Sequence, residues 1–249
     1  DSIEYARRIQ TSLLPNMAEL KQRLPNSFLI WVPRDVVGGD VYYVDFFEEG
    51  FIISLIDCTG HGVPGALMTM IASSGMRRII RDENQRDPAE ILKRLNFFIK
   101  TSLQQDTTHA SSDDGLEAAV CYVNLKDQTL SFSGARQPLV VVNNGRSELI
   151  KGDRVSIGYK NSDLAHQFCR HVLPLEPGMR FYLYSDGFVD QIGEEKPVSF
   201  GKSRLLNLLT EYSELPFKEQ KSRLLEAFQA FKGESETRDD FTFVGFSVD

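Results

Sequence analysis

With 249 residues, of which 41% are hydrophobic and 25% charged, the chain is long enough to bury a substantial core as one large domain or two small ones. Its 28 basic and 35 acidic side chains give a formal net charge of −7, which argues against a nucleic-acid-binding protein, because such proteins present a basic surface. The three cysteines, Cys58, Cys121 and Cys169, are far apart and lack a C-x-x-C pair, so the sequence indicates neither disulfides nor a zinc site.

The chain opens on an amphipathic helix over residues 1–14, which Pro15 ends. One stripe of this helix carries Ile3, Ala6, Ile9 and Leu13. The stripe either packs against the chain's own domain or connects it, as in a coiled coil, to an upstream domain or a dimer partner. With a second short helix before Pro25, it forms an N-terminal linker or dimerisation segment over residues 1–25, and residues 26–249 form the main domain. Because the chain starts abruptly on a helix, we expect a fragment of a longer protein.

The next segment predicts a β-hairpin. Apolar runs over residues 41–47 and 51–56 are separated by the acidic, glycine-containing turn Glu48-Glu49-Gly50. Antiparallel pairing of these runs places Asp40 and Asp57 near the same end of the sheet. Two carboxylates at one sheet end are costly unless a cation neutralises them, so the hairpin indicates a cation site.

The rest of the chain alternates blocks of helices and strands. Helices are expected over residues 63–81, 88–105, 201–212 and 216–232. Strands are expected over residues 28–32, 117–124, 128–133, 138–143, 147–151, 167–173 and 180–185, with a last strand after Asp239 and Asp240. This order predicts an α+β fold with antiparallel sheets rather than repeated βαβ units.

Four acidic positions share one local pattern, in which an aspartate stands at the end of an apolar strand beside small residues or glycine. They are Asp40, Asp57, Asp186 and the pair Asp239-Asp240. Any one such acid is more often a turn or cap residue, but acids from distant parts of a chain converge when a cation joins them. Carboxylates without cysteine, and with few histidines, favour Mg²⁺ or Mn²⁺ over zinc. Two such ions sharing a carboxylate, ~3.5–4 Å apart, form the clamp used in phosphoryl chemistry.

The same residues carry a family resemblance. The segments VGGD-VYYV, DCTGHGVPGALM, LNFFI, YSDGFVDQ, FG and DDFTFV follow the motif order of the metal-dependent PPM-type Ser/Thr protein phosphatases. More narrowly, they resemble the bacterial SpoIIE/RsbU branch, over roughly residues 1–249. The resemblance implies a central sandwich of two antiparallel β-sheets flanked by helix pairs, with an N-terminal linker helix. It also implies two Mn²⁺ or Mg²⁺ ions at one edge, and makes residues 26–249 the phosphatase domain.

The resemblance further implies a role for each acid. Asp57 would bridge both ions and so act in catalysis. Asp40 and the backbone carbonyl of Cys58 would complete one ion site, and Asp186 and Asp239 would hold the other. A metal-bridging water would then attack phosphorus directly, without a phosphoenzyme.

Three further positions have candidate roles at the site, and a fourth departs from the family pattern. Asp240 is either a partner that supports the ligands or the ligand in place of Asp239. His61 either protonates the departing serine or threonine oxygen, because histidine titrates near neutral pH, or only orients its turn by hydrogen bonding. Arg34 either contacts the substrate phosphate or is a surface charge. The chain departs from the branch at GARQPL, where Arg136 replaces the histidine of a frequent A-G-H-x-P-P stretch.

The implied substrate is phosphoserine or phosphothreonine on a partner protein, typically in this branch an anti-sigma-factor antagonist with a STAS-type fold. We expect a homodimer through the N-terminal helix, and a cytoplasmic location, since cysteines that form no disulfides fit a reducing compartment. No apolar run approaches the ~18 residues of a membrane span, so no segment is expected to cross a membrane. This fragment is expected to make no membrane contact, although the full-length protein would be membrane-anchored if it resembles SiaA-like phosphatases with a HAMP linker. Two other functions stay open: a catalytically silent PPM-like signalling module, and a metal-dependent phosphodiesterase or nucleotidase.

Overall fold

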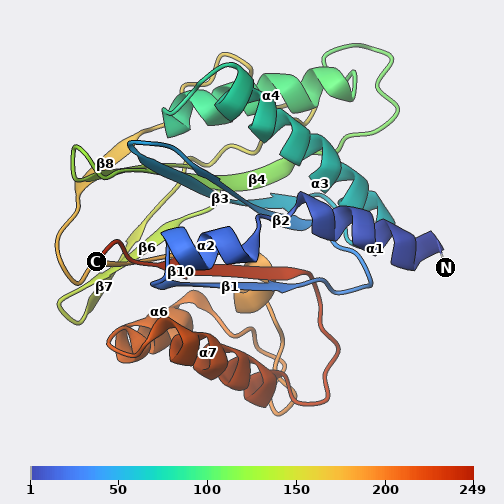
Figure 1. Cartoon of the computed structure of the whole chain (residues 1–249). Coiled ribbons are helices and arrows are strands. Elements are labelled where there is room, and N and C mark those ends of the chain that lie inside the picture. The colour runs from blue at the N-terminus through green and yellow to red at the C-terminus, as the bar shows by residue number, and fades with distance from the viewer. Residues whose placement is uncertain (1) are drawn as a thin grey trace.

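Two five-stranded antiparallel sheets lie face to face in the computed structural model, which describes residues 2–249 (Figure 1). The first sheet has the order β2-β3-β4-β5-β8, with β2 (Asp40–Phe46), β3 (Gly50–Cys58), β4 (Leu116–Asn124), β5 (Thr129–Ala135) and β8 (His171–Pro174). The second has the order β1-β10-β9-β6-β7, with β1 (Ser27–Val32), β10 (Phe241–Phe246), β9 (Arg180–Tyr184), β6 (Leu139–Asn143) and β7 (Arg146–Ile150). The predicted hairpin is confirmed as β2 and β3.

A pair of helices covers the outer face of each sheet, which confirms the predicted α+β sandwich (Figure 1). The first sheet carries α3 (Gly62–Arg77) and α4 (Pro88–Ser102), and the second carries α6 (Lys202–Tyr212) and α7 (Phe217–Lys232). The remaining helices are α1 (Ser2–Leu13), α2 (Met17–Arg23) and the four-residue α5 (Asp186–Val189). Among residues 2–249, no helix combines the length and the apolar character that a bilayer crossing requires.

Two predicted boundaries were wrong, and a third segment is helical over the predicted range but changes its helix type. The helix expected to Arg81 is α-helical to Arg77 and continues as a π-helix, η1 (Arg78–Asp82). The helix expected to reach residue 105 ends at Ser102, because Gln104 adopts a positive φ of 55° that does not continue a right-handed helix. The strand expected over residues 167–173 starts only at His171, since the backbone N–H of Cys169 donates to the Asp153 carboxylate instead of to a strand.

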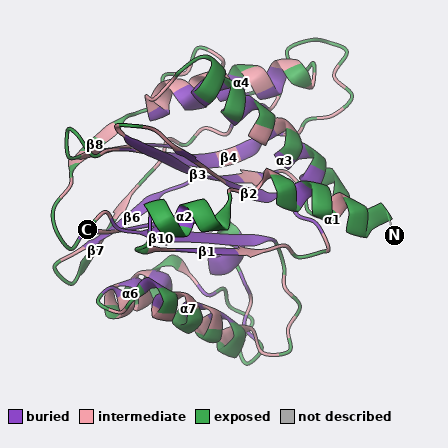
Figure 2. Ribbon diagram, in the orientation of Figure 1, coloured by how far each residue is buried: buried purple, intermediate pink, exposed green. Residues whose placement is uncertain are grey.

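Alternate residues of each strand face opposite cores. On β3, Leu55 faces the second sheet and packs in the same cluster as Phe246, whereas Ile56 faces the helices α3 and α4. A third cluster, which includes Phe243, fills the space between the second sheet and the helices α6 and α7. Figure 2 shows the sheets as mostly buried and the outer helix surfaces as exposed. The strands are therefore rigid supports for residues placed at their ends.

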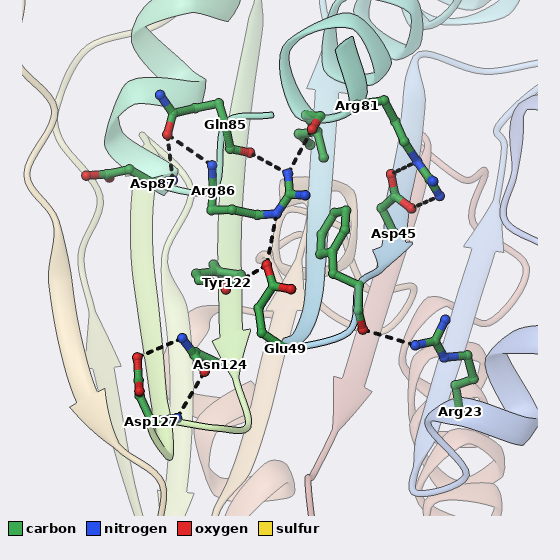
Figure 3. A network of polar contacts seen from close by, with 12 residues as sticks. Arg23, Asp45, Glu49, Arg81, Gln85, Arg86, Asp87, Tyr122, Asn124 and Asp127 are labelled. Carbon is green, nitrogen blue, oxygen red and sulfur yellow. Dashed lines mark hydrogen bonds and ion pairs between the residues drawn. The ribbon is translucent and has the colours of Figure 1, made fainter. Parts of the chain in front are cut away.

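The β2–β3 hairpin is fixed at the end that lies away from its two terminal aspartates (Figure 3). Arg81, from the π-helix, binds both carboxylate oxygens of Asp45 on β2. The Nε atom of Arg86 lies 3.4 Å from Oε1 of Glu49 in the hairpin turn. Arg23 of α2 donates a 3.2 Å hydrogen bond to the backbone carbonyl of Phe47. These contacts tie the hairpin to the π-helix, to the loop that follows it and to α2, and limit its movement.

The N-terminal helix α1 is anchored by a polar side chain. Ile3 and Ile9 of its apolar stripe are 37% and 36% exposed, whereas Gln10 is only 2% exposed. The Gln10 amide donates to the carbonyl of Gly38 at 2.6 Å and to Oγ1 of Thr69 at 3.0 Å, and accepts from the Gly38 N–H at 3.2 Å. Gln10 therefore joins α1, the loop before β2 and α3, while pairing of the apolar stripe with a second copy stays a prediction.

Candidate functional site

Three carboxylates lie in a row across the first sheet. The strand register places Asp40 of β2 directly opposite Asp57 of β3, and Asp57 directly opposite Glu117 of β4. All three share the strand face that looks toward the second sheet, because Leu55 and Ala119, two residues from Asp57 and Glu117, lie in the core between the sheets. Like charges directly opposite each other destabilise a sheet. The row, named here the acid row, therefore needs a compensating partner.

Glu117 is the member of the acid row that the sequence analysis missed. The register of the next strand against the hairpin is the sequence signal that points to Glu117. A strand over residues 117–124 that pairs antiparallel with the hairpin starts opposite the end of β3, and so places an acidic residue beside Asp57.

The second sheet adds acids at the same end of the sandwich. Asp186 follows β9 and begins α5, while Asp239 lies just before β10. Besides burial, the charges of Asp186 and Asp239 both raise the pKa of Asp57, so these acids lie near the acid row at this end of the sandwich. Ser185 joins the two sides, because its hydroxyl donates a 2.6 Å hydrogen bond to Oδ2 of Asp40.

Burial, together with the charges of neighbouring acids, raises the pKa values of these acids. Burial, opposed by the hydrogen bond from Ser185 and reinforced by the charge of Asp240, raises the pKa of Asp40 to about 7. Burial and the charge of Asp40 raise the pKa of Asp57 well above its usual range. Removal from water and the charge of Asp190 raise the pKa of Asp186 to about 6. Without a cation, these carboxyls therefore keep their protons to a higher pH than an ordinary aspartate does.

Asp239 and Asp240 occupy different environments. Asp240 is 3% exposed, and its two carboxylate oxygens accept hydrogen bonds of 2.6 Å from the backbone N–H groups of Arg34 and Gly39. Asp239 is exposed, and its Oδ1 atom accepts a 2.9 Å hydrogen bond from the Asp240 N–H. Asp240 thus holds the loop before Asp40. The Asp239 carboxylate accepts one hydrogen bond, through Oδ1, and its other oxygen remains available to a ligand.

Close backbone packing brings the loops of the site together. A Cβ atom on Gly39 would lie 2.2 Å from the carbonyl oxygen of Gly60 and 3.0 Å from that of Cys58. Only glycine allows this approach. The Cys58 N–H also donates a 2.9 Å hydrogen bond to the Gly39 carbonyl. The loop that leads to Asp40 therefore lies directly against the segment that carries Cys58, whose thiol is free, like those of Cys121 and Cys169.

His61 lies at the edge of the site and has an acidic partner that the sequence analysis did not identify. Its Nδ1 atom lies 2.8 Å from Oδ2 of Asp35, and both side chains are about half exposed. Nδ1 of the histidine is thereby engaged, and Nε2 is left for another partner. Arg34 is also at this edge, where its guanidinium donates a 3.1 Å hydrogen bond to the carbonyl of Arg238.

The donor set suits hard divalent cations. Carboxylate and carbonyl oxygens are the ligands that Mg²⁺ and Mn²⁺ prefer, and a cation would offset the burial and the repulsion that raise the pKa values of Asp40 and Asp57. In the part of the chain from residue 2 to residue 249, no three Asp, Glu, His or Cys side chains are placed as a ready-made cation cage. The residues present therefore fit such ions by chemistry and charge, with the carboxylates facing one another rather than already enclosing a common point.

The raised pKa values predict an unusual pH dependence of stability. Asp40, Asp57 and Asp186 bind protons more tightly in the folded chain than at the ordinary aspartate pKa of 3.8, so the folded state holds more protons than the unfolded state. The free energy of unfolding of the metal-free protein therefore falls as the pH rises from about 4 to about 7. With a chelator present, we expect the thermal unfolding midpoint to be higher at pH 6 than at pH 8. Each kcal/mol of difference in the free energy of unfolding shifts the midpoint by about 2–4 °C.

Thermal unfolding scans at the two pH values measure this difference. Asp40→Asn lacks the carboxyl that titrates near pH 7 and is the control, with a smaller expected difference. A midpoint that rises from pH 6 to pH 8 in the unmodified protein would contradict the assigned charge repulsion.

The sequence matches one protein-family model. Residues 48–249 match the model of Stage II sporulation protein E, abbreviated SpoIIE. The chain is also 25% identical, over 247 residues, to the phosphoserine phosphatase RsbP of Bacillus subtilis (strain 168). That similarity covers 97% of this chain but 56% of RsbP, so the chain spans little more than half the length of this relative.

Solved structures show the same fold. The SiaA-PP2C domain of Pseudomonas aeruginosa is similar with a TM-score of 0.90 and 35% identity, over 100% of this chain and 96% of that domain. The PP2C phosphatase domain of SpoIIE from Bacillus subtilis, solved with a fragment of its regulatory domain, has a TM-score of 0.72 and 15% identity, over 90% of this chain and 63% of that one. Its sequence match, its sandwich fold and the acids at one end of its two sheets place this chain in the SpoIIE family of PP2C-type phosphatases.

Proposed function

We propose that this chain is a metal-dependent protein serine/threonine phosphatase that uses two Mn²⁺ or Mg²⁺ ions. The observation that carries the proposal is the meeting of Asp40 and Asp57, from the first sheet, with Asp186 and Asp239, from the second, at one end of the sandwich. Two further findings support it. The chain belongs to the SpoIIE family, and its relative RsbP is named a phosphoserine phosphatase.

Each acid has a separate place in the proposed cation site. Asp57, in the middle of the acid row, would be shared by the two ions. Asp40 and the backbone carbonyl of Cys58 would hold one ion, and Asp186 and Asp239 the other. Asp240 is already bonded to two backbone N–H groups and would support the ligands rather than bind an ion. Bound divalent cations lower the pKa of water and neutralise charge on the transferred phosphoryl group.

The protein's own residues supply orientation and a proton. In the proposed mechanism, Asp35 fixes the His61 ring through Nδ1, and the protonated ring donates from Nε2 to the departing serine or threonine oxygen. Arg34 lies beside Asp239 and Asp240, and its guanidinium would contact an oxygen of the substrate phosphate. The same geometry is compatible with the alternative that His61 only orients the turn, and the pH dependence of turnover in a His61→Gln variant separates the two roles.

We further propose that the substrate is a phosphorylated protein with a STAS-type fold and that the enzyme acts in the cytoplasm. The free thiols of the described residues support a reducing compartment. Pairing of two copies through α1 is also proposed, and the exposed Ile3 and Ile9 of its apolar stripe support it. Deleting residues 1–14 and measuring the oligomeric state by sedimentation tests this pairing.

The decisive experiment is phosphate release from candidate phosphorylated STAS-type proteins, with and without Mn²⁺. We expect release that needs the metal and stops on chelation, with p-nitrophenyl phosphate as a poor substitute and nucleotides not hydrolysed. Hydrolysis of nucleotides in preference to phosphoproteins would favour a nucleotidase. Titration calorimetry with Mn²⁺ separates an enzyme from a silent signalling module, since a silent module should bind the ion weakly or not at all.

A further inference from the structure

The Glu117 end of the acid row carries an arginine in an unusual backbone conformation. Arg136 follows the last residue of β5, and its φ of 59° lies in the left-handed region that residues with side chains rarely adopt. The surrounding structure fixes this conformation, because the Arg136 N–H donates a 2.8 Å hydrogen bond to the carbonyl of Asp153.

The side chain of Arg136 is directed by Glu117. Its Nε atom lies 3.7 Å from Oε1 of Glu117, which is itself directly opposite Asp57 in the strand register. The Arg136 side chain is 53% exposed, and among residues 2–249 Glu117 is its one charged partner. The terminal N–H groups of the guanidinium are therefore available to a ligand that approaches the acid row from solvent.

Two cations lie among the acids at this end of the row. Burial and the charge of Asp186 raise the pKa of Glu117, whereas Arg136 and Lys202, the first residue of α6, lower it, so both cations lie close enough to Glu117 to act on its carboxyl. Arg34 lies at the other end of the row, near Asp40, and already donates to a backbone carbonyl. A guanidinium with free N–H groups matches the geometry of a phosphate or carboxylate better than an ammonium group does.

We propose that Arg136 binds an oxyanion of the phosphorylated substrate at the Glu117 end of the acid row, with Glu117 as its positioning residue. This inference rests on the proposed phosphatase function and states where the substrate of that site lies. The oxyanion belongs either to the phosphoryl group itself or to a carboxylate that neighbours the phosphorylated residue. Both sources present the same oxygen chemistry to the guanidinium, and two substrates distinguish them.

The test compares Arg136→Ala, Arg136→Gly and Arg136→Lys with the unmodified protein. Steady-state kinetics at saturating Mn²⁺ use p-nitrophenyl phosphate and a phosphoserine protein. Alanine and glycine should raise KM by about tenfold or more with little change in kcat, and lysine should raise it less. A rise for both substrates identifies the phosphoryl group as the ligand, and a rise for the phosphoprotein alone identifies a neighbouring carboxylate.

Arg136→Gly also controls for folding. Glycine adopts a φ near 59° without strain, so this variant should unfold at the same temperature as the unmodified protein or a higher one. A raised KM in a protein of undiminished stability cannot come from misfolding. An unchanged KM for both substrates in the glycine variant would overturn the proposal.

Glu117→Gln tests the positioning role. It should raise KM in the unmodified background but add nothing in the Arg136→Gly background, because the residue it positions is then absent. Equal effects of Glu117→Gln in both backgrounds would show that Glu117 acts independently of Arg136, and would overturn its positioning role.

A binding measurement keeps this inference separate from the proposed function. Titration calorimetry with inorganic phosphate in the presence of Mg²⁺ needs no turnover. Weaker phosphate binding by Arg136→Gly, in a chain that hydrolyses no phosphoprotein, would support the oxyanion site and count against the phosphatase. Unchanged phosphate binding together with unchanged KM, in a chain that does hydrolyse phosphoproteins, would overturn only the role of Arg136.

Discussion

Replacing Asp57 by asparagine is expected to lower phosphatase turnover by roughly a thousandfold. The side chain lies at the centre of the acid row, with Asp40 on one side and Glu117 on the other, and it is the proposed ligand shared by both ions. Bound cations supply several kcal/mol of charge stabilisation to the transition state. Because about 1.4 kcal/mol changes a rate tenfold, loss of the cations corresponds to a factor of roughly a thousand. Phosphate release at saturating Mn²⁺ measures the loss, and calorimetry should show weaker Mn²⁺ binding.

The same substitution should not damage the fold. Burial and the charge of Asp40 raise the pKa of Asp57, so ionising this carboxyl opposes folding when no cation is present. Asparagine removes that charge in a side chain of nearly the same shape. The metal-free Asp57→Asn protein should therefore unfold at a higher temperature than the unmodified protein at pH 8. Full activity in this variant would refute the proposed site.

Asp45 provides the matched control for Asp57. It lies on the same hairpin, is 4% exposed, and is bound by Arg81 at the end opposite the acid row (Figure 3). Asp45→Asn should therefore show the reverse pattern, with a free energy of unfolding lowered by about 1–3 kcal/mol and Mn²⁺-dependent turnover retained. If both variants lose stability and activity together, the loss at Asp57 reflects general damage to the hairpin and not the removal of a ligand.

Replacing Asp240 by alanine is expected to have the largest effect on stability among the acids of the site. Its buried carboxylate accepts 2.6 Å hydrogen bonds from the backbone N–H groups of Arg34 and Gly39. A hydrogen bond to a charged group contributes about 1.5–3 kcal/mol, and an unsatisfied buried N–H adds a further penalty. We expect the free energy of unfolding to fall by about 3 kcal/mol or more. Chemical denaturation with and without Mn²⁺ measures it.

Asp239→Ala separates the role of a ligand from that of an anchor. Asp239 is exposed and accepts one hydrogen bond, from the N–H of Asp240. Its replacement should leave the stability of the metal-free protein nearly unchanged while weakening Mn²⁺ binding and turnover. If Asp240→Ala instead weakened Mn²⁺ binding without lowering stability, Asp240 would be the ligand and the assignment of the pair would reverse.

Much of the fold could be predicted because it depends on local patterns. The hairpin of β2 and β3 follows from two apolar runs and an acidic turn, and the helices near residues 202–212 and 217–232 follow from apolar periodicity. Asp40 and Asp57 could be placed at the same sheet end because a hairpin fixes its own register. The convergence of acids from the second sheet could be expected only from the family resemblance, because no local rule relates Asp186 to Asp57.

What the sequence did not reveal depends on contacts between distant segments. Glu117 joins the acid row only through the register of β4 against β3, and Asp35 reaches His61 only when two loops meet. The burial of Gln10 could not be expected either, because a glutamine on an amphipathic helix normally faces water, and here backbone groups of another loop satisfy it. In each case a polar residue gains its role from a partner that no periodicity identifies.

The proposed cation ligands come from both layers of the sandwich, so cation binding depends on the two layers being packed together. Neither layer of the sandwich contains all of the proposed ligands, since Asp40 and Asp57 come from one layer and Asp186 and Asp239 from the other. A partly unfolded chain in which the layers have separated would keep its strands but hold no ion between them. Loss of cation binding would then report the opening of the interface between the layers, before the strands themselves unravel.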